Sequence, residues 1–229
     1  MRSTLPLIPL LVFLLSVLAY EGATCADGEG VALFAAIAES DCAAVESLLD
    51  DGANVSARDD IDATPLMRAL ENNLPRDCVL TLLQAGADPN AIHGSLKISV
   101  LMVAASYSTA EVVSLLIESG AEVDFATPDA WTALMSAARN SSRPGVIGEL
   151  AAAGANINAR DQYGVTPLMR AAQANPNPEI IETLVQLGAD PTIQTPAGHT
   201  AYDLAKGNGR GREVLALLVP ESLESGNVD

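Results

Sequence analysis

Thr166-Pro167-Leu168-Met169-Arg170-Ala171-Ala172 decides the fold, because related stretches return along the chain. The copies are Thr64-Pro65-Leu66-Met67-Arg68-Ala69, Ser99-Val100-Leu101-Met102-Val103-Ala104-Ala105 and Thr132-Ala133-Leu134-Met135-Ser136-Ala137-Ala138. A Gly-Ala pair recurs with a period of 34 residues, as Gly52-Ala53, Gly86-Ala87, Gly120-Ala121, Gly154-Ala155 and Gly188-Ala189. A fixed period of this length is the signature of a solenoid, whose units bury their apolar faces by stacking on one another.

The residues of each unit predict a pair of helices. Thr followed by Pro is a good helix start, because the hydroxyl caps free backbone N–H groups and Pro suits the first helical position. An apolar stripe such as Val112-Val113-Ser114-Leu115-Leu116 follows, and the Gly after it is a left-handed helix stop. The Asn- and Asp-rich stretches beyond each Gly then supply turn-forming residues.

On these residues the chain resembles the ankyrin repeat family, which carries a T-P-L-H-x-A signature. The resemblance implies an all-α fold, an ankyrin repeat solenoid of about six helix-turn-helix repeats with β-turn fingers, and a role in protein binding. One departure is consistent, because the family's His is replaced by Met67, Met102, Met135 and Met169. We expect these methionines to lie in the core and to hold the repeats by apolar packing instead of hydrogen bonds.

The resemblance covers residues 28–219, and we expect repeats at about 28–59, 60–92, 93–126, 127–160, 161–194 and 195–219. The first repeat lacks Thr-Pro and the last lacks Gly-Ala and carries basic residues, as terminal capping repeats should. Residues 220–229 are short and polar and are expected to form a flexible tail.

The N-terminus has the pattern of a secretory leader. Arg2 precedes an apolar run from Leu5 to Ala19, and small residues follow. We predict a signal peptide at residues 1–23, with the cut possible anywhere between 19 and 26, and therefore a periplasmic or secreted protein. The alternatives are an uncleaved anchor, although the run falls short of about 20 apolar residues, and a lipid anchor at Cys25.

The charge excludes some partners. Twelve basic and 29 acidic residues give a net charge of −17, which repels nucleic acids and anionic membrane surfaces. We expect a protein partner with a basic face and no contact with a membrane after leader cleavage; the alternative is that the acidity only gives solubility. A capped solenoid is expected to be a monomer.

The three cysteines leave several arrangements open. Stacked repeats lie about 10 Å apart, whereas disulfide-bonded Cα atoms lie within about 7 Å. A Cys42–Cys78 bond is therefore not expected without a bend, Cys25–Cys42 would staple the N-terminal arm, and two buried free thiols are preferred. No catalytic motif, metal-ligand spacing or cofactor signature is present, so we expect no enzyme activity, no metal and no cofactor.

The binding residues follow from the resemblance, which places the fingers and the inner face of each first helix on a concave side. Aromatic residues and arginines dominate the centres of interfaces. We predict a central anchor of Tyr107, Trp131, Arg139 and Tyr163. We predict an acidic rim of Asp60, Glu71, Asp129 and Asp161. The alternative for Trp131 is packing against the neighbouring turn.

Together these features predict a non-catalytic, exported scaffold that binds a partner protein through its concave acidic face, including as the inhibitor or immunity partner of a toxic enzyme. The alternative is a secreted effector that contacts host-cell proteins.

Overall fold

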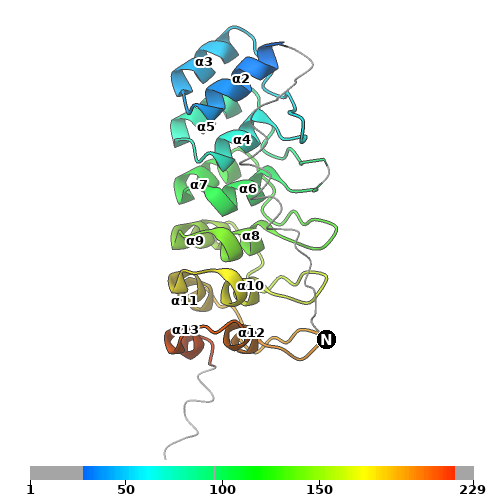
Figure 1. The fold of residues 1–229 in the computed structure, drawn as a ribbon, viewed down its shortest axis with the longest axis vertical. Coiled ribbons are helices and arrows are strands. Elements are labelled where there is room, and N and C mark those ends of the chain that lie inside the picture. The colour runs from blue at the N-terminus through cyan, green and yellow to red at the C-terminus, as the bar shows by residue number, and fades with distance from the viewer. Residues whose placement is uncertain (1–27, 95, 220–229) are drawn as a thin grey trace, which may run out of the picture.

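The computed structural model describes residues 28–94 and 96–219, which form an elongated stack of helix pairs (Figure 1). One row holds the first helix of each pair: α2 (Gly28–Ala38), α4 (Pro65–Glu71), α6 (Val100–Tyr107), α8 (Ala133–Asn140), α10 (Pro167–Ala174) and α12 (Ala201–Gly207). The other row holds the second helices: α3 (Cys42–Asp50), α5 (Arg76–Gln84), α7 (Ala110–Glu118), α9 (Pro144–Ala152), α11 (Pro178–Gln186) and α13 (Arg212–Leu217). The predicted all-α solenoid of helix pairs is confirmed.

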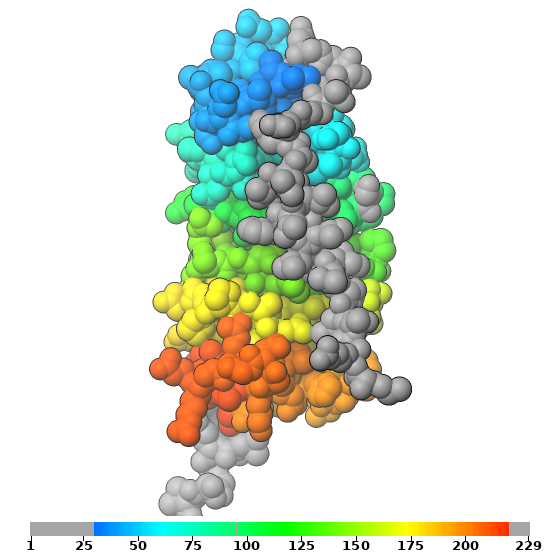
Figure 2. Space-filling model, in the orientation of Figure 1, coloured from blue at the N-terminus to red at the C-terminus, as the bar shows by residue number. Residues whose placement is uncertain are grey.

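Each helix contacts its counterpart in the next repeat, so the repeats stack in chain order (Figure 2). The loops that precede α4, α6, α8, α10 and α12 all project from the same side of the stack (Figure 1). We call these loops fingers, at residues 59–63, 93–98, 127–131, 161–165 and 195–199. Every finger is closed by one backbone hydrogen bond between its ends, and the first of these runs from Asp59 N to Ala63 O at 3.1 Å.

The helix starts follow the chemistry expected from the sequence. The hydroxyl oxygens of five residues accept a hydrogen bond from the third helical N–H of the helix that follows: Thr64, Ser99, Thr132, Thr166 and Thr200. The five periodic glycines after the second helices all have φ between 91° and 94°. Because that left-handed conformation is costly for any residue with a Cβ, glycine is what permits the turn there.

The core lies between the two rows of helices and runs through all the repeats. Met67, Met102, Met135 and Met169 have exposed fractions of 1% or less, which confirms their expected place in the core. Paired alanines such as Ala137 and Ala138 are also buried and allow neighbouring helices to approach closely.

Asparagine side chains add hydrogen bonds between repeats. Asn90 donates from Nδ2 to Gly120 O at 2.8 Å and accepts at Oδ1 from Glu122 N at 2.8 Å. Asn158 makes the same two bonds to Gly188 O and Asp190 N, at 3.3 and 2.9 Å. Apolar packing at the methionines is therefore accompanied by amide bridges at the turns, which the sequence analysis did not anticipate.

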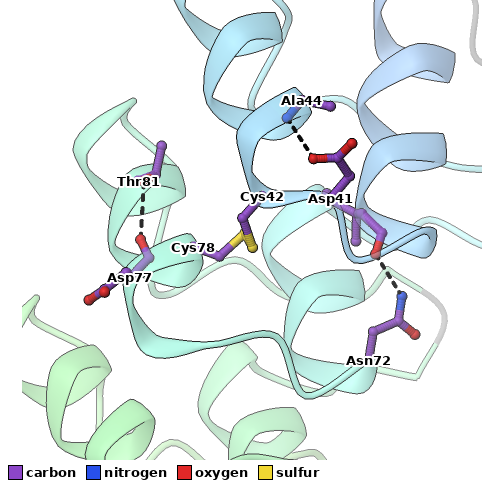
Figure 3. Close-up of a disulfide and its surroundings, with 8 residues drawn as sticks. Asp41, Cys42, Ala44, Asn72, Asp77, Cys78 and Thr81 are labelled. Atoms are coloured by element: carbon purple, nitrogen blue, oxygen red, sulfur yellow. Dashed lines mark hydrogen bonds between the residues drawn. A yellow bond between two sulfur atoms is a disulfide. The ribbon is translucent and has the colours of Figure 1, made fainter.

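The cysteines correct the preference for free thiols, because Cys42 and Cys78 form a disulfide (Figure 3). Their Cα atoms are 5.5 Å apart. The distance between helix axes exceeds the distance between the Cα atoms that face one another. Helix axes about 10 Å apart, each with Cα atoms on a radius of about 2.3 Å, leave about 5 Å between facing Cα atoms. Cys42 begins α3 and Cys78 lies in the first turn of α5, and these helices contact one another directly.

The expected leader, Cys25 and the tail lie outside the described residues and stay predictions. Within residues 28–94 and 96–219, no helix has the length and hydropathy needed to cross a membrane.

Candidate binding surface

The surface on which the fingers meet the first helices carries the residues of the predicted anchor. Tyr163 lies in the finger of the fifth repeat, at residues 161–165, with 53% of its surface exposed. Trp131 ends the preceding finger and Tyr107 ends α6, and both are partly buried against the core. Arg139 is half-buried in the last turn of α8. The anchor is therefore spread over three successive repeats on one side of the stack (Figure 1).

A buried aspartate organises two of the fingers. In the finger of the fifth repeat, Asp161 Oδ1 accepts hydrogen bonds from the backbone N–H groups of Tyr163 and Val165, at 2.8 and 2.9 Å. Its other oxygen pairs with Arg170 of α10. Because the carboxylate is shared between the finger backbone and a helix side chain, the finger is clamped to the helix that follows it.

The finger of the second repeat has the same aspartate–arginine arrangement, with a second carboxylate added. Asp59 Oδ1 accepts from Ile61 N and Ala63 N at 3.1 and 2.9 Å, and Oδ2 lies 2.5 Å from Arg68 Nη2. Arg68 also pairs with Glu71 at 2.9 Å. These contacts raise the pKa of Arg68 above its usual value, although burial alone would lower it. Arg68 is therefore fully paired.

Trp131 is held by contacts from two repeats. Its indole N–H donates to Ser136 Oγ in α8 at 2.8 Å. The Arg170 guanidinium of the next repeat lies over the ring, 4.6 Å from its centroid. This is the geometry of a cation–π contact. Both contacts are with helix side chains, and the alternative considered for Trp131, packing against the neighbouring turn, stays a prediction.

Arg139 has no hydrogen-bond or ion-pair partner among the described residues. Burial and the nearby positive charge of Arg170 lower the pKa of Arg139. Arg170 is itself only partly satisfied, because its Nε is buried without a hydrogen-bond partner in the described part of the chain. Two guanidinium groups therefore lie close together at this place, and among the described residues only Arg170 has a carboxylate partner, Asp161.

The four residues of the predicted acidic rim differ in their exposure and in their contacts. Asp60 and Asp129 are exposed, and Asp129 O accepts from Gln162 N of the next finger at 2.9 Å. Glu71 is half-buried and shared with Arg68, and together with burial it raises the pKa of Tyr107. Asp161 corrects the expectation of an exposed rim residue, since it is only 6% exposed. It is buried because the folded finger needs its carboxylate as an acceptor.

Sequence reasoning overlooked Arg170, although a signal for it exists. Both stretches that read Thr-Pro-Leu-Met-Arg are preceded, five residues before the Thr, by an aspartate: Asp59 and Asp161. That recurring spacing identifies the ion pair that the structure shows. Nothing in the spacing reveals that Arg170 also reaches Trp131, which is 39 positions away in the chain.

The described residues hold no group of three or more His, Cys, Asp or Glu side chains that could bind a metal ion. Two shallow hollows of about 150 and 250 Å³ are lined by other parts of the repeats, and neither includes a residue of the predicted anchor.

The stacked helix pairs with projecting fingers define a repeat scaffold, and the comparisons name its family. A family model described as "Ankyrin repeats (3 copies)" matches residues 8–93 and 101–195, and the chain belongs to the ankyrin repeat family. A search of curated proteins found no match.

Among solved structures, the chain is similar to an immunity protein bound to another protein. That structure is the Bd0816 predatory endopeptidase from Bdellovibrio bacteriovorus in complex with immunity protein Bd3460. The sequences are 27% identical, the match covers 82% of this chain and 96% of the other, and the TM-score is 0.67. The family and this neighbour support a protein-binding scaffold.

Proposed function

We propose that this chain is an exported, non-catalytic scaffold that binds a partner protein through its concave face and acts as the immunity partner of a toxic enzyme. The observation that carries the proposal is the likeness to an immunity protein in complex with an endopeptidase, which extends over 96% of that chain. The secreted effector remains a second possibility from the sequence, but no contact in the structure favours it.

The anchor supports the concave face as the binding surface. Tyr163 is exposed, Trp131 and Arg139 are partly exposed, and aromatic residues and arginines are the types that interface centres favour. Asp60 and Asp129 are exposed on other fingers of the same side, on a chain of net charge −17. This pattern favours a partner whose contact face is basic around its edge.

The disulfide supports export. Disulfides form and persist in oxidising compartments and are rare in the cytosol. A Cys42–Cys78 bond between two repeats is therefore consistent with the leader-like N-terminus, and we infer a periplasmic or secreted location. The leader, the location and a monomeric state are parts of the proposal.

An affinity capture tests the proposed function. Mature protein is immobilised and incubated with extract from the native source, beside a Trp131→Ala/Tyr163→Ala double variant and an Arg76→Gln control. Arg76 is exposed at the start of α5, in the other row of helices. We expect wild type and control to retain one protein in a stoichiometric amount and the double variant to lose it.

The immunity role requires a second readout. The retained protein should be an enzyme, and adding one equivalent of this chain should abolish its activity. Retention of no protein, or of an enzyme that stays fully active, would contradict the proposed function. Equal retention by the double variant would move the binding surface away from the anchor.

A further inference from the structure

Two clusters of charged side chains on the finger side of the stack, one in the second repeat and one at the fourth and fifth repeats, carry opposite net charge. At the second repeat, one guanidinium faces two carboxylates: Arg68 with Asp59 and Glu71. In the fifth repeat, the position of Glu71 is taken by Gln173, whose Oε1 accepts only a long 3.5 Å hydrogen bond from Arg170. Arg139 from the fourth repeat adds a second guanidinium there. We call Arg139, Arg170 and Asp161 the cationic centre.

The cationic centre has donors that the described chain does not use. None of the five N–H donors that a guanidinium carries is occupied on Arg139 by a described residue. Arg170 Nε is also without a partner but is buried, so Arg170 contributes its positive charge to the centre and not this donor. Arg139 is half-exposed, so its donors can reach a bound partner. Two like charges in a partly buried place repel each other, and a bound anion would relieve that repulsion.

We propose that the cationic centre receives the side-chain carboxylate of a Glu or Asp in an internal segment of the partner protein, laid against Trp131 and Tyr163. This inference rests on the proposed function and adds the chemistry of its central contact. A partner fitting this surface is basic around its edge and carries one acidic side chain at its middle.

Charge complementarity decides the occupant. Planar guanidinium groups bind carboxylates through paired hydrogen bonds that are stronger than neutral ones. A nucleic-acid phosphate would also fit a guanidinium, but the net charge of −17 opposes a polyanion. First helices and fingers continue on both sides of the centre, in α6 and α12, so a segment can extend across it in both directions (Figure 1). That continuity favours an internal side chain over a chain terminus.

Trp131 provides the reporter, because it is the only tryptophan in the chain. The probes are two capped pentapeptides, Ac-Ala-Leu-Glu-Leu-Ala-NH2 and its Gln counterpart, followed by tryptophan fluorescence and by the single indole N–H resonance in NMR. We expect a saturable response to the Glu peptide in the millimolar range and binding about tenfold weaker for the Gln peptide.

Variants locate the contact. Arg139→Gln should weaken binding of the Glu peptide about tenfold, whereas Arg76→Gln should leave it unchanged within about twofold. Arg139 has no partner in the described fold, so its replacement should leave the circular dichroism and unfolding midpoint unchanged. An Arg139→Lys variant should bind between wild type and Arg139→Gln, because it keeps the charge but loses the planar fork.

Three outcomes would overturn the inference: no saturable response, equal binding of the Glu and Gln peptides, or full binding by Arg139→Gln. An equal response to a Gln peptide with a free C-terminal carboxylate would assign the centre to a chain terminus instead. The affinity capture distinguishes a failure of this inference from a failure of the proposed function. If wild type and Arg139→Gln retain the same partner equally, the inference fails and the proposed function stands; if wild type retains nothing, the proposed function fails.

Discussion

The first two repeats and the fourth and fifth repeats use the same parts to different ends. The first two are joined by a disulfide, and Arg68 is paired with two carboxylates. The fourth and fifth have no cysteine, and Arg170 shares one carboxylate while it covers Trp131. The difference teaches that two repeats with the same finger can pair their charged groups fully or only in part.

Loss of the disulfide between the first two repeats should cause the largest decrease in the free energy of unfolding. A Cys42→Ser/Cys78→Ser double variant should lower the free energy of unfolding by about 4 kcal/mol, because the bond closes a loop of sequence separation 36 and restricts the unfolded chain. Urea unfolding measures the loss. A reducing agent should destabilise wild type equally and leave the double variant unaffected. Titration of two free thiols in unreduced native protein would contradict the bond.

The two aspartates should differ in their importance. Asp161→Asn should lower the free energy of unfolding by about 3 kcal/mol, because it leaves the largely buried Arg170 without a carboxylate. Asp59→Asn should cost less, about 1 kcal/mol, since Glu71 still pairs with Arg68. Both variants keep an oxygen that can accept from the finger backbone, so the comparison isolates the charge. Equal losses in urea unfolding would show that Glu71 does not compensate.

The contact between the Trp131 ring and the Arg170 guanidinium should give a measurable coupling energy in the free energy of unfolding. A double-mutant cycle of Trp131→Leu and Arg170→Met should give about 1 kcal/mol, the size of a partly desolvated cation–π pair. The matched cycle uses Trp131→Leu with Arg68→Met. Arg68 occupies the same place in its own repeat but lies three repeats away from Arg170, so that cycle should be additive. Coupling in both cycles would point to a general effect of removing an arginine.

Two opposite substitutions in neighbouring fingers, Ala130→Gly and Gly164→Ala, should change the stability of the fold in opposite directions. Ala130 has φ of 58°, which is unfavourable for a residue with a Cβ, so Ala130→Gly should stabilise the protein by up to about 1 kcal/mol. Gly164→Ala should destabilise it by about 1 kcal/mol or more. At φ of 70° its new Cβ would lie 2.9 Å from both Arg160 Nη2 and Pro196 Cδ. Thermal unfolding measures the change in midpoint of each variant. A change in the same direction for both variants would contradict the assignment of backbone strain.

Much of the fold could be predicted because it depends on local chemistry that repeats. Thr or Ser before most of the first helices, Gly after most of the second helices and Met on the buried face act within a few residues of themselves, so their spacing shows the helix pairs directly. The candidate surface was also within reach, since the resemblance places Trp131 and Tyr163 on the finger side. Whether those residues bind a partner stays a prediction.

The sequence by itself determined the repeat period, the start and stop signals of the helix pairs, the core methionines and the excess of negative charge, because each is a property of residue type and spacing. Only the tertiary structure decided that Cys42 meets Cys78, that Asp161 is buried by its own finger and that Arg170 lies over Trp131 beside Arg139. These contacts depend on the distance between facing surfaces of stacked helices. A side chain's partner in the next repeat is fixed by that stacking geometry, which the pattern within one repeat does not contain.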